Sequence, residues 1–104
     1  MTLPEHWANF STELSHAMMH ARGEMLERYA GKGQLAPDVD MTSYLSTVTG
    51  VEVGVIHDMQ LNEAIRHPSK VAKVTKALAG IVANESVRSR LLSAADKVVP
   101  MVAS

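Results

Sequence analysis

A stripe of apolar residues near the N-terminus constrains the fold more than any other feature. Its members alternate between spacings of four and three, which places them on one face of an α-helix. They are Leu3, Trp7, Phe10, Leu14, Ala17 and Ala21. Thr2 and Glu5 have capping-box spacing at the start of this helix. Gly31 is expected to end it in the left-handed conformation. The narrow stripe is typical of a helix in a bundle or coiled coil.

The middle of the chain predicts shorter elements. Asp40 is a candidate N-cap for a short helix that holds Tyr44, Leu45 and Val48, and Thr49-Gly50 is expected to break it. Residues 51–56 alternate like a β-strand, yet the apolar positions of 51–66 also share one helical face: Val51, Val55, Met59 and Ile65. A lone strand has no partner elsewhere in this sequence. We therefore favour a helix that runs to about Arg66.

The last third predicts two further helices. Pro68-Ser69 begins the first of them, and its apolar face is expected to continue past Gly80. This face comprises Val71, Val74, Leu78, Ile81 and Val82. Asn84-Glu85 then caps the final helix, whose apolar face is Val87, Leu91, Leu92, Ala95, Val98, Val99 and Val102. The sequence thus predicts an all-α fold, a single compact bundle of four to five helices with residues 1–104 as one domain.

The charges of this chain are divided between its two parts. Residues 1–65 carry nine acidic and three basic side chains, and residues 66–104 carry seven basic and two acidic ones. The overall charge of −1 therefore hides segments of −6 and +5. A molecule divided in this way can pair its own halves, pair with a second copy, or present one sign to a partner.

The basic part suggests one alternative function, a small DNA-binding regulator. Residues 69–92 have a helix–glycine–helix order that superficially resembles a helix-turn-helix. Its basic residues are Lys70, Lys73, Lys76, Arg88 and Arg90. The isoelectric point of about 6.5 and the lack of aromatic residues among these bases count against nucleic-acid binding. Arg88 falls inside the apolar face of the last helix, so it either extends to solvent or reaches an acid of another helix or subunit.

Residues that could carry chemistry form only weak patterns. His16 and His20 lie one helical turn apart and share a face with Glu13, which is a possible but weak metal-ligand set. We favour simple solvation of these side chains. No nucleophile elbow or phosphate-binding loop is present, so we expect neither an enzyme nor a cofactor.

The sequence favours a role in protein–protein interaction. Met19 and Leu26 fall off the main stripe and form a second, smaller apolar face on the first helix. We expect an adaptor, regulator or inhibitor that binds another protein, itself as a homodimer, or both. The absence of cysteine favours a cytoplasmic location. No apolar run is long enough to predict a membrane span or a signal peptide.

Overall fold

The structure is a computed structural model that describes residues 2–34 and 40–102. Within these ranges the chain forms five α-helices and one short 3₁₀ helix, and it contains no β-strand. The predicted all-α bundle is therefore confirmed. In chain order the elements are α1 (Leu3–Gly31), α2 (Met41–Thr49), α3 (Val53–Gln60), η1 (Ala64–Arg66), α4 (Pro68–Ala79) and α5 (Glu85–Val102).

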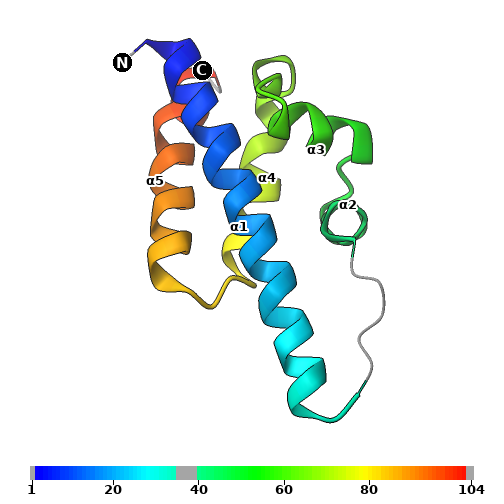
Figure 1. The fold of residues 1–104 in the computed structure, drawn as a ribbon. Helices are drawn as coiled ribbons and strands as arrows, with labels where there is room; N and C mark the ends of the chain where they lie inside the picture. Colours follow the sequence, from blue (N-terminus) through cyan, green and yellow to red (C-terminus); the bar gives the residue numbers. More distant parts are fainter. Residues whose placement is uncertain (1, 35–39, 103–104) are drawn as a thin grey trace.

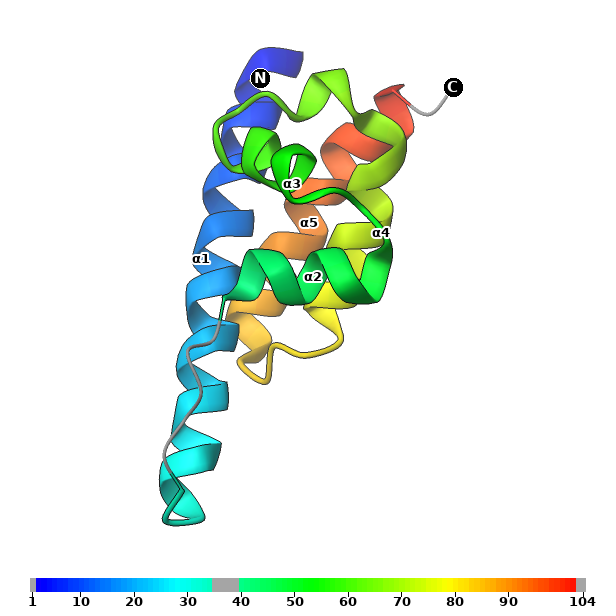
Figure 2. The ribbon, with the colours of Figure 1, turned by 90° about the vertical axis from the view of Figure 1, so that its right-hand side faces the viewer.

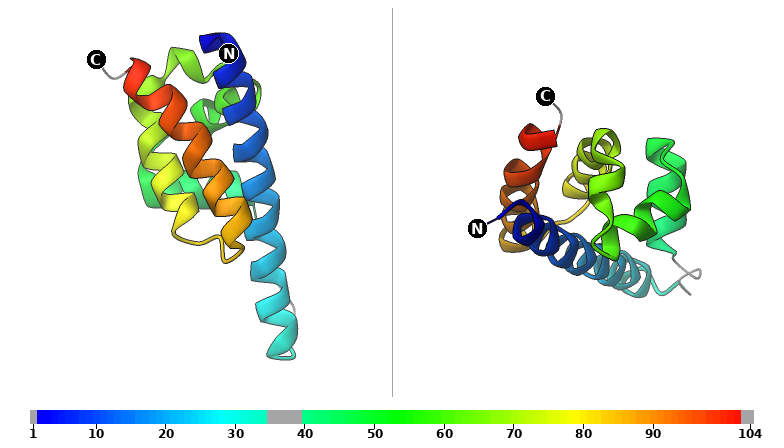
Figure 3. Two further views of the ribbon diagram at one scale, coloured as in Figure 1. Left: turned by 90° about the vertical axis from the view of Figure 1, so that its left-hand side faces the viewer. Right: turned by 90° about the horizontal axis from the view of Figure 1, so that it is seen from above.

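The helices form three layers (Figure 1). Helices α1 and α4 make the middle layer, α5 covers one side of it, and α2 and α3 cover the other. Helices α1 and α5 run antiparallel along much of their length (Figure 3). The last turns of α1 extend beyond the α4–α5 connection, as Figure 2 also shows. At 1.5 Å per residue, 29 residues span about 43 Å, so this one helix accounts for most of the 47 Å long dimension.

Helix α1 begins as the sequence predicts. The Thr2 hydroxyl accepts a hydrogen bond from the Glu5 amide at 3.3 Å and contacts the Glu5 carboxylate at 3.1 Å. At the other end, Gly31 is still helical and Gly33 is the residue with positive φ, at 68°. The amides of Gly33 and Gln34 donate to the carbonyls of Ala30 and Tyr29, which is a Schellman motif. The prediction of Gly31 as the left-handed residue is therefore wrong by two positions.

Helix α2 matches its predicted ends. The Asp40 carboxylate accepts from the amides of Thr42 and Ser43, and it also accepts from the Ser43 hydroxyl at 2.9 Å. These hydrogen bonds, with the one from the Ser43 side chain largest, lower the pKa of Asp40. Gly50 follows the helix with φ of 76°, a conformation that glycine adopts without steric cost.

The segment 51–66 is helical at its start, but not to Arg66 as predicted. Helix α3 stops at Gln60, and a turn with Asn62 at φ 64° leads into η1. Val51, Val55 and Met59 are buried as expected, whereas Ile65 is 49% exposed. Because the helix ends before this turn, Ile65 does not continue the apolar face of α3, and the prediction of one helical face through residue 65 is wrong.

The α4–α5 connection is longer than predicted. Helix α4 ends at Ala79, and residues 80–84 connect it to α5, so Ile81 and Val82 lie in the connection rather than in the helix. Val82 is nevertheless buried. The Asn84 side chain accepts from the Val87 amide at 3.1 Å, which confirms the predicted cap of α5.

The core is aliphatic with one aromatic pair. Trp7 and Phe10 are buried and meet edge to face, with ring centroids 6.0 Å apart. The apolar faces of the other helices pack around them, including Leu45, Ile56, Leu78 and Leu91. On α5 the predicted face is buried apart from Leu92, which is 41% exposed, and Val99, which is half-buried; the side chain of Val102 lies outside the described residues.

Candidate interaction surface

Beside the local pair of Arg66 with Glu63, two ion pairs between distant residues that the structure describes join the acidic and basic segments within one molecule. The Lys70 ammonium lies 2.7 Å from a Glu52 carboxylate oxygen, and Arg90 Nε lies 3.4 Å from Glu13 Oε2. The hydrogen bond from Lys70 and its positive charge lower the pKa of Glu52. The charge asymmetry of the sequence is therefore partly compensated inside the fold. It is a weaker argument for a charged partner than the sequence suggests.

The remaining lysines of α4 lie at the surface. Lys73 and Lys76 are exposed, and neither makes an ion pair with a residue that the structure describes. Helices α4 and α5 form an antiparallel hairpin (Figure 3), whereas a helix-turn-helix crosses its two helices at about 90–120°. Nothing in this arrangement favours DNA binding by residues 69–92, and that function stays a prediction.

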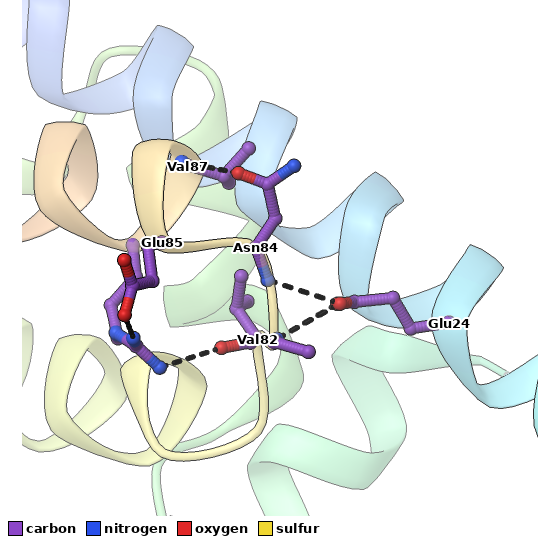
Figure 4. Close-up of polar contacts among 7 residues, drawn as sticks. Glu24, Val82, Asn84, Glu85 and Val87 are labelled. Carbon is purple, nitrogen blue, oxygen red and sulfur yellow. Dashed lines mark hydrogen bonds and ion pairs between the residues drawn. The ribbon is translucent and has the colours of Figure 1, made fainter.

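Arg88 is partly exposed and makes local contacts at the start of α5. Its Nη1 donates to the Val82 carbonyl at 3.1 Å, and its Nη2 lies 3.8 Å from the Glu85 carboxylate one turn earlier (Figure 4). The guanidinium is therefore partnered by the preceding connection and by its own helix. Of the two alternatives that the sequence left open, neither describes these contacts fully.

The histidine pair does not gather further metal ligands. The rings of His16 and His20 lie edge to face with centroids 4.8 Å apart. Glu13, the third candidate, is only 18% exposed and faces Arg90. In the described ranges, no group of three or more His, Asp or Glu side chains is arranged to hold a metal ion.

Glu24 makes a contact that sequence reasoning missed. From α1 its carboxylate reaches the α4–α5 connection and accepts from two consecutive backbone amides (Figure 4). The Ala83 amide lies 2.9 and 3.1 Å from its two oxygens, and the Asn84 amide lies 3.2 Å from one of them. These amides directly precede α5, where a negative charge is also favoured by the helix dipole. Glu24 thus joins the projecting part of α1 to the start of α5.

Two large apolar side chains are more exposed than any others that the structure describes. Met19 on α1 is 71% exposed, and Leu61, just after α3, is 72% exposed. Between α1 and the α3–η1 turn lies an open hollow of about 580 Å³. Met19 lines this hollow, as do Gln60 and Asn62 on either side of Leu61. The α1 wall consists of His16 and of the small residues Ala8, Ser11, Thr12 and Ser15. We call Met19, Leu61 and the hollow the α1–α3 patch.

Local structure holds both sides of this patch in place. The buried Ser11 hydroxyl donates to the Met59 carbonyl, which fixes the end of α3 against α1. The Glu63 amide donates to the Asp58 carbonyl at 2.7 Å and closes the turn around Asn62. Asparagine tolerates the left-handed conformation better than most residues. Leu61 lies at the start of this turn and is exposed.

Leu26, the second member of the predicted apolar face, is half-buried and does not line the hollow. Of the sequence-predicted interaction residues, only Met19 belongs to the α1–α3 patch. The exposure of Leu61 depends on the end of α3, which the sequence placed too late.

No helix in the described chain has both the length and the hydrophobicity needed to cross a bilayer. Comparisons with known protein families, curated proteins and solved structures give no match to this chain.

Proposed function

We propose that this protein is a small interaction module that acts through the α1–α3 patch. The observation that carries the proposal is that Met19, which is 71% exposed, lines a hollow walled by small residues. Gln60 and Asn62 line the same hollow, and Leu61 between them in the sequence is 72% exposed. Contiguous exposed apolar surface on a folded protein marks sites of interaction with other proteins.

A second copy of the chain is the partner that this surface fits. Met19 projects from α1 beside a hollow, so the same face offers both a protruding side chain and a place to receive one. In a two-fold dimer the same patch meets itself, and residue i of one copy contacts residue j of the other in both directions. Met19 of each copy can then enter the hollow of its partner. Methionine suits such a contact because its side chain adapts to irregular gaps.

We expect this association to be weak. A standard interface covers about 800 Å² on each partner. That is roughly an eighth of the 5970 Å² surface of this chain. The patch presents two large apolar side chains in a largely polar surround, so we expect a dissociation constant in the range of about 1 µM to 1 mM.

Sedimentation velocity over a range of concentrations tests the proposal. The wild-type mass should rise from 11.3 kDa toward twice that value as concentration increases. Met19→Glu and Leu61→Glu should keep the protein monomeric, because each places a charge in the apolar contact. Val48→Glu is the matched control, since Val48 is 53% exposed on α2 and does not line the hollow.

The result that contradicts the proposal is a wild-type protein that remains monomeric up to millimolar concentration. A dimer that Val48→Glu weakens as much as Met19→Glu does would also exclude this patch as the interface. Circular dichroism of each variant shows whether the fold is retained.

A further inference from the structure

A second hollow lies between α1 and α5, away from the residues of the α1–α3 patch. It has a volume of about 250 Å³. From α1 it is lined by His6, Asn9 and Glu13, which share one helical face, and from α5 by Arg90, Ser93, Ala94 and Lys97. The antiparallel course of the two helices brings these polar faces together (Figure 3). Except for Ala94, every lining side chain is polar.

The ion pair in this hollow holds the arginine in a defined orientation. Arg90 Nε lies 3.4 Å from Glu13 Oε2, and Arg90 Nη1 donates to the Ser86 hydroxyl at 3.3 Å. These two contacts involve Arg90 Nε and Nη1. No contact involves Arg90 Nη2 in the described part of the chain, so two of its N–H groups remain available to a ligand.

The lining carries excess positive charge. Glu13 is compensated by Arg90, and Lys97 makes no ion pair with the residues that the structure describes. The charged side chains of the lining therefore sum to +1 with His6 neutral. Asn9, Ser93 and His6 add uncharged hydrogen-bond donors. A site with two cationic groups and several neutral donors suits an oxygen-rich anion.

We propose that this hollow binds a phosphate group. Arg90 Nη2 and the Lys97 ammonium donate charge-assisted hydrogen bonds to the anion, and the Asn9 amide and the Ser93 hydroxyl donate to its remaining oxygens. Pockets for drug-sized ligands measure about 300–1,000 Å³, so a hollow of about 250 Å³ suits a small anion or the phosphate end of a larger molecule. Glu13 is a positioning residue here, because it orients Arg90. This proposal does not depend on self-association.

Titration with inorganic phosphate, followed by NMR of the ¹⁵N-labelled protein at constant ionic strength, tests the site. The amides of Asn9, Ser93 and Lys97 should shift along saturable curves that share one dissociation constant. Lys97→Ala should weaken binding about fivefold or more, which corresponds to the loss of one charge-assisted contact. Lys97→Arg should restore it. Lys73→Ala is the matched control, because Lys73 is an exposed lysine on α4 outside the hollow.

Three results would overturn the proposal. One is a set of shifts that rise linearly without saturation, which indicates general screening. Another is equal weakening by Lys97→Ala and Lys73→Ala, which indicates attraction to surface lysines at large. The third is an equal affinity for acetate, because a carboxylate offers fewer oxygens and less charge than phosphate and should bind more weakly.

Discussion

Removal of the Glu24 carboxylate should destabilise the protein by separating α1 from the start of α5. Two amides donate to this carboxylate, with the closest N···O distance 2.9 Å. A hydrogen bond to a charged group contributes about 1.5–3 kcal/mol net, and the charge at a helix N-terminus adds about 0.3–1 kcal/mol. Both amides can be hydrated when the carboxylate is lost, because the contact lies at the surface. We therefore expect Glu24→Ala to cost about 1.5–2 kcal/mol in total.

That loss converts to a fall in melting temperature of about 6–12 °C for a domain of this size. Glu24→Gln keeps one oxygen acceptor but no charge, so it should cost about half as much. Thermal unfolding followed by circular dichroism measures these differences. Hydrogen exchange should be faster at the amides of Ala83 and Asn84 in both variants, because these are the donors.

Glu27→Ala is the control for this prediction. Glu27 is an exposed acid on the same helix, three residues further on, and makes no polar contact with the described residues. Its removal should change the free energy of unfolding by less than about 0.5 kcal/mol. If Glu24→Ala is no less stable than Glu27→Ala, and exchange at Ala83 and Asn84 is unchanged, the contact does not stabilise the fold.

Three further predictions concern the core, the turns and the surface charges. Trp7→Ala should lower the free energy of unfolding by about 3–5 kcal/mol, because the ring is only 2% exposed; an unchanged melting temperature would contradict its burial. Gly50→Ala should lower the free energy of unfolding by about 1–2 kcal/mol, because φ is 76° at this position. Gly23→Ala within α1 should raise it by about 0.5–1 kcal/mol, because alanine favours a helix more than glycine does. Denaturant titrations that rank the two variants in the opposite order would refute this. The pKa of Glu52 is lowered in the folded protein, so the stabilisation by its charged form is present above about pH 4.3 and is lost as the pH falls through the lowered pKa. Lys70→Ala should remove this part of the pH dependence of the melting temperature. A variant with the same pH profile as the wild type would contradict the pairing.

Much of the fold could be predicted because its signals are local. The α1 stripe, the Asp40 cap and the Asn84 cap each depend on residues within a few positions of one another, and the structure confirms all three. Such signals identify an element and its buried face without reference to the rest of the chain.

The errors arose where a residue further along the chain decides the outcome. In the Gly31-Lys32-Gly33 sequence either glycine could end α1, and the Schellman bonds select the second. The end of α3 is set by the Asn62 turn and by the Ser11 contact from α1, which no local pattern shows. The Ser11 contact joins two elements that the sequence treats separately.

The candidate sites were harder to predict for the same reason. Met19 was found as an apolar residue off the main stripe, but Gln60 and Asn62 reach the hollow beside α1 only through the end of α3 and the turn that follows it. Arg90 and Glu13 are 77 positions apart in the sequence, and Glu24 accepts from amides 59 and 60 positions away. Charge counting detects such residues but does not identify their partners.

Broadening of amide signals by a spin label on a second copy tests most directly whether two copies meet through the α1–α3 patch. The chain has no cysteine, so Gly23→Cys provides one attachment point for a spin label. Gly23 is exposed, a side chain there meets no atom within 4 Å, and it lies about 6 Å beyond Met19 along α1. Labelled chain without ¹⁵N is mixed with ¹⁵N-labelled wild type, so that only contacts between copies are seen. We expect broadening of the amides of Ser15, Met19 and Asn62, and its loss when both chains carry Leu61→Glu. Broadening confined to the exposed face of α4, or none at millimolar concentration, would contradict it.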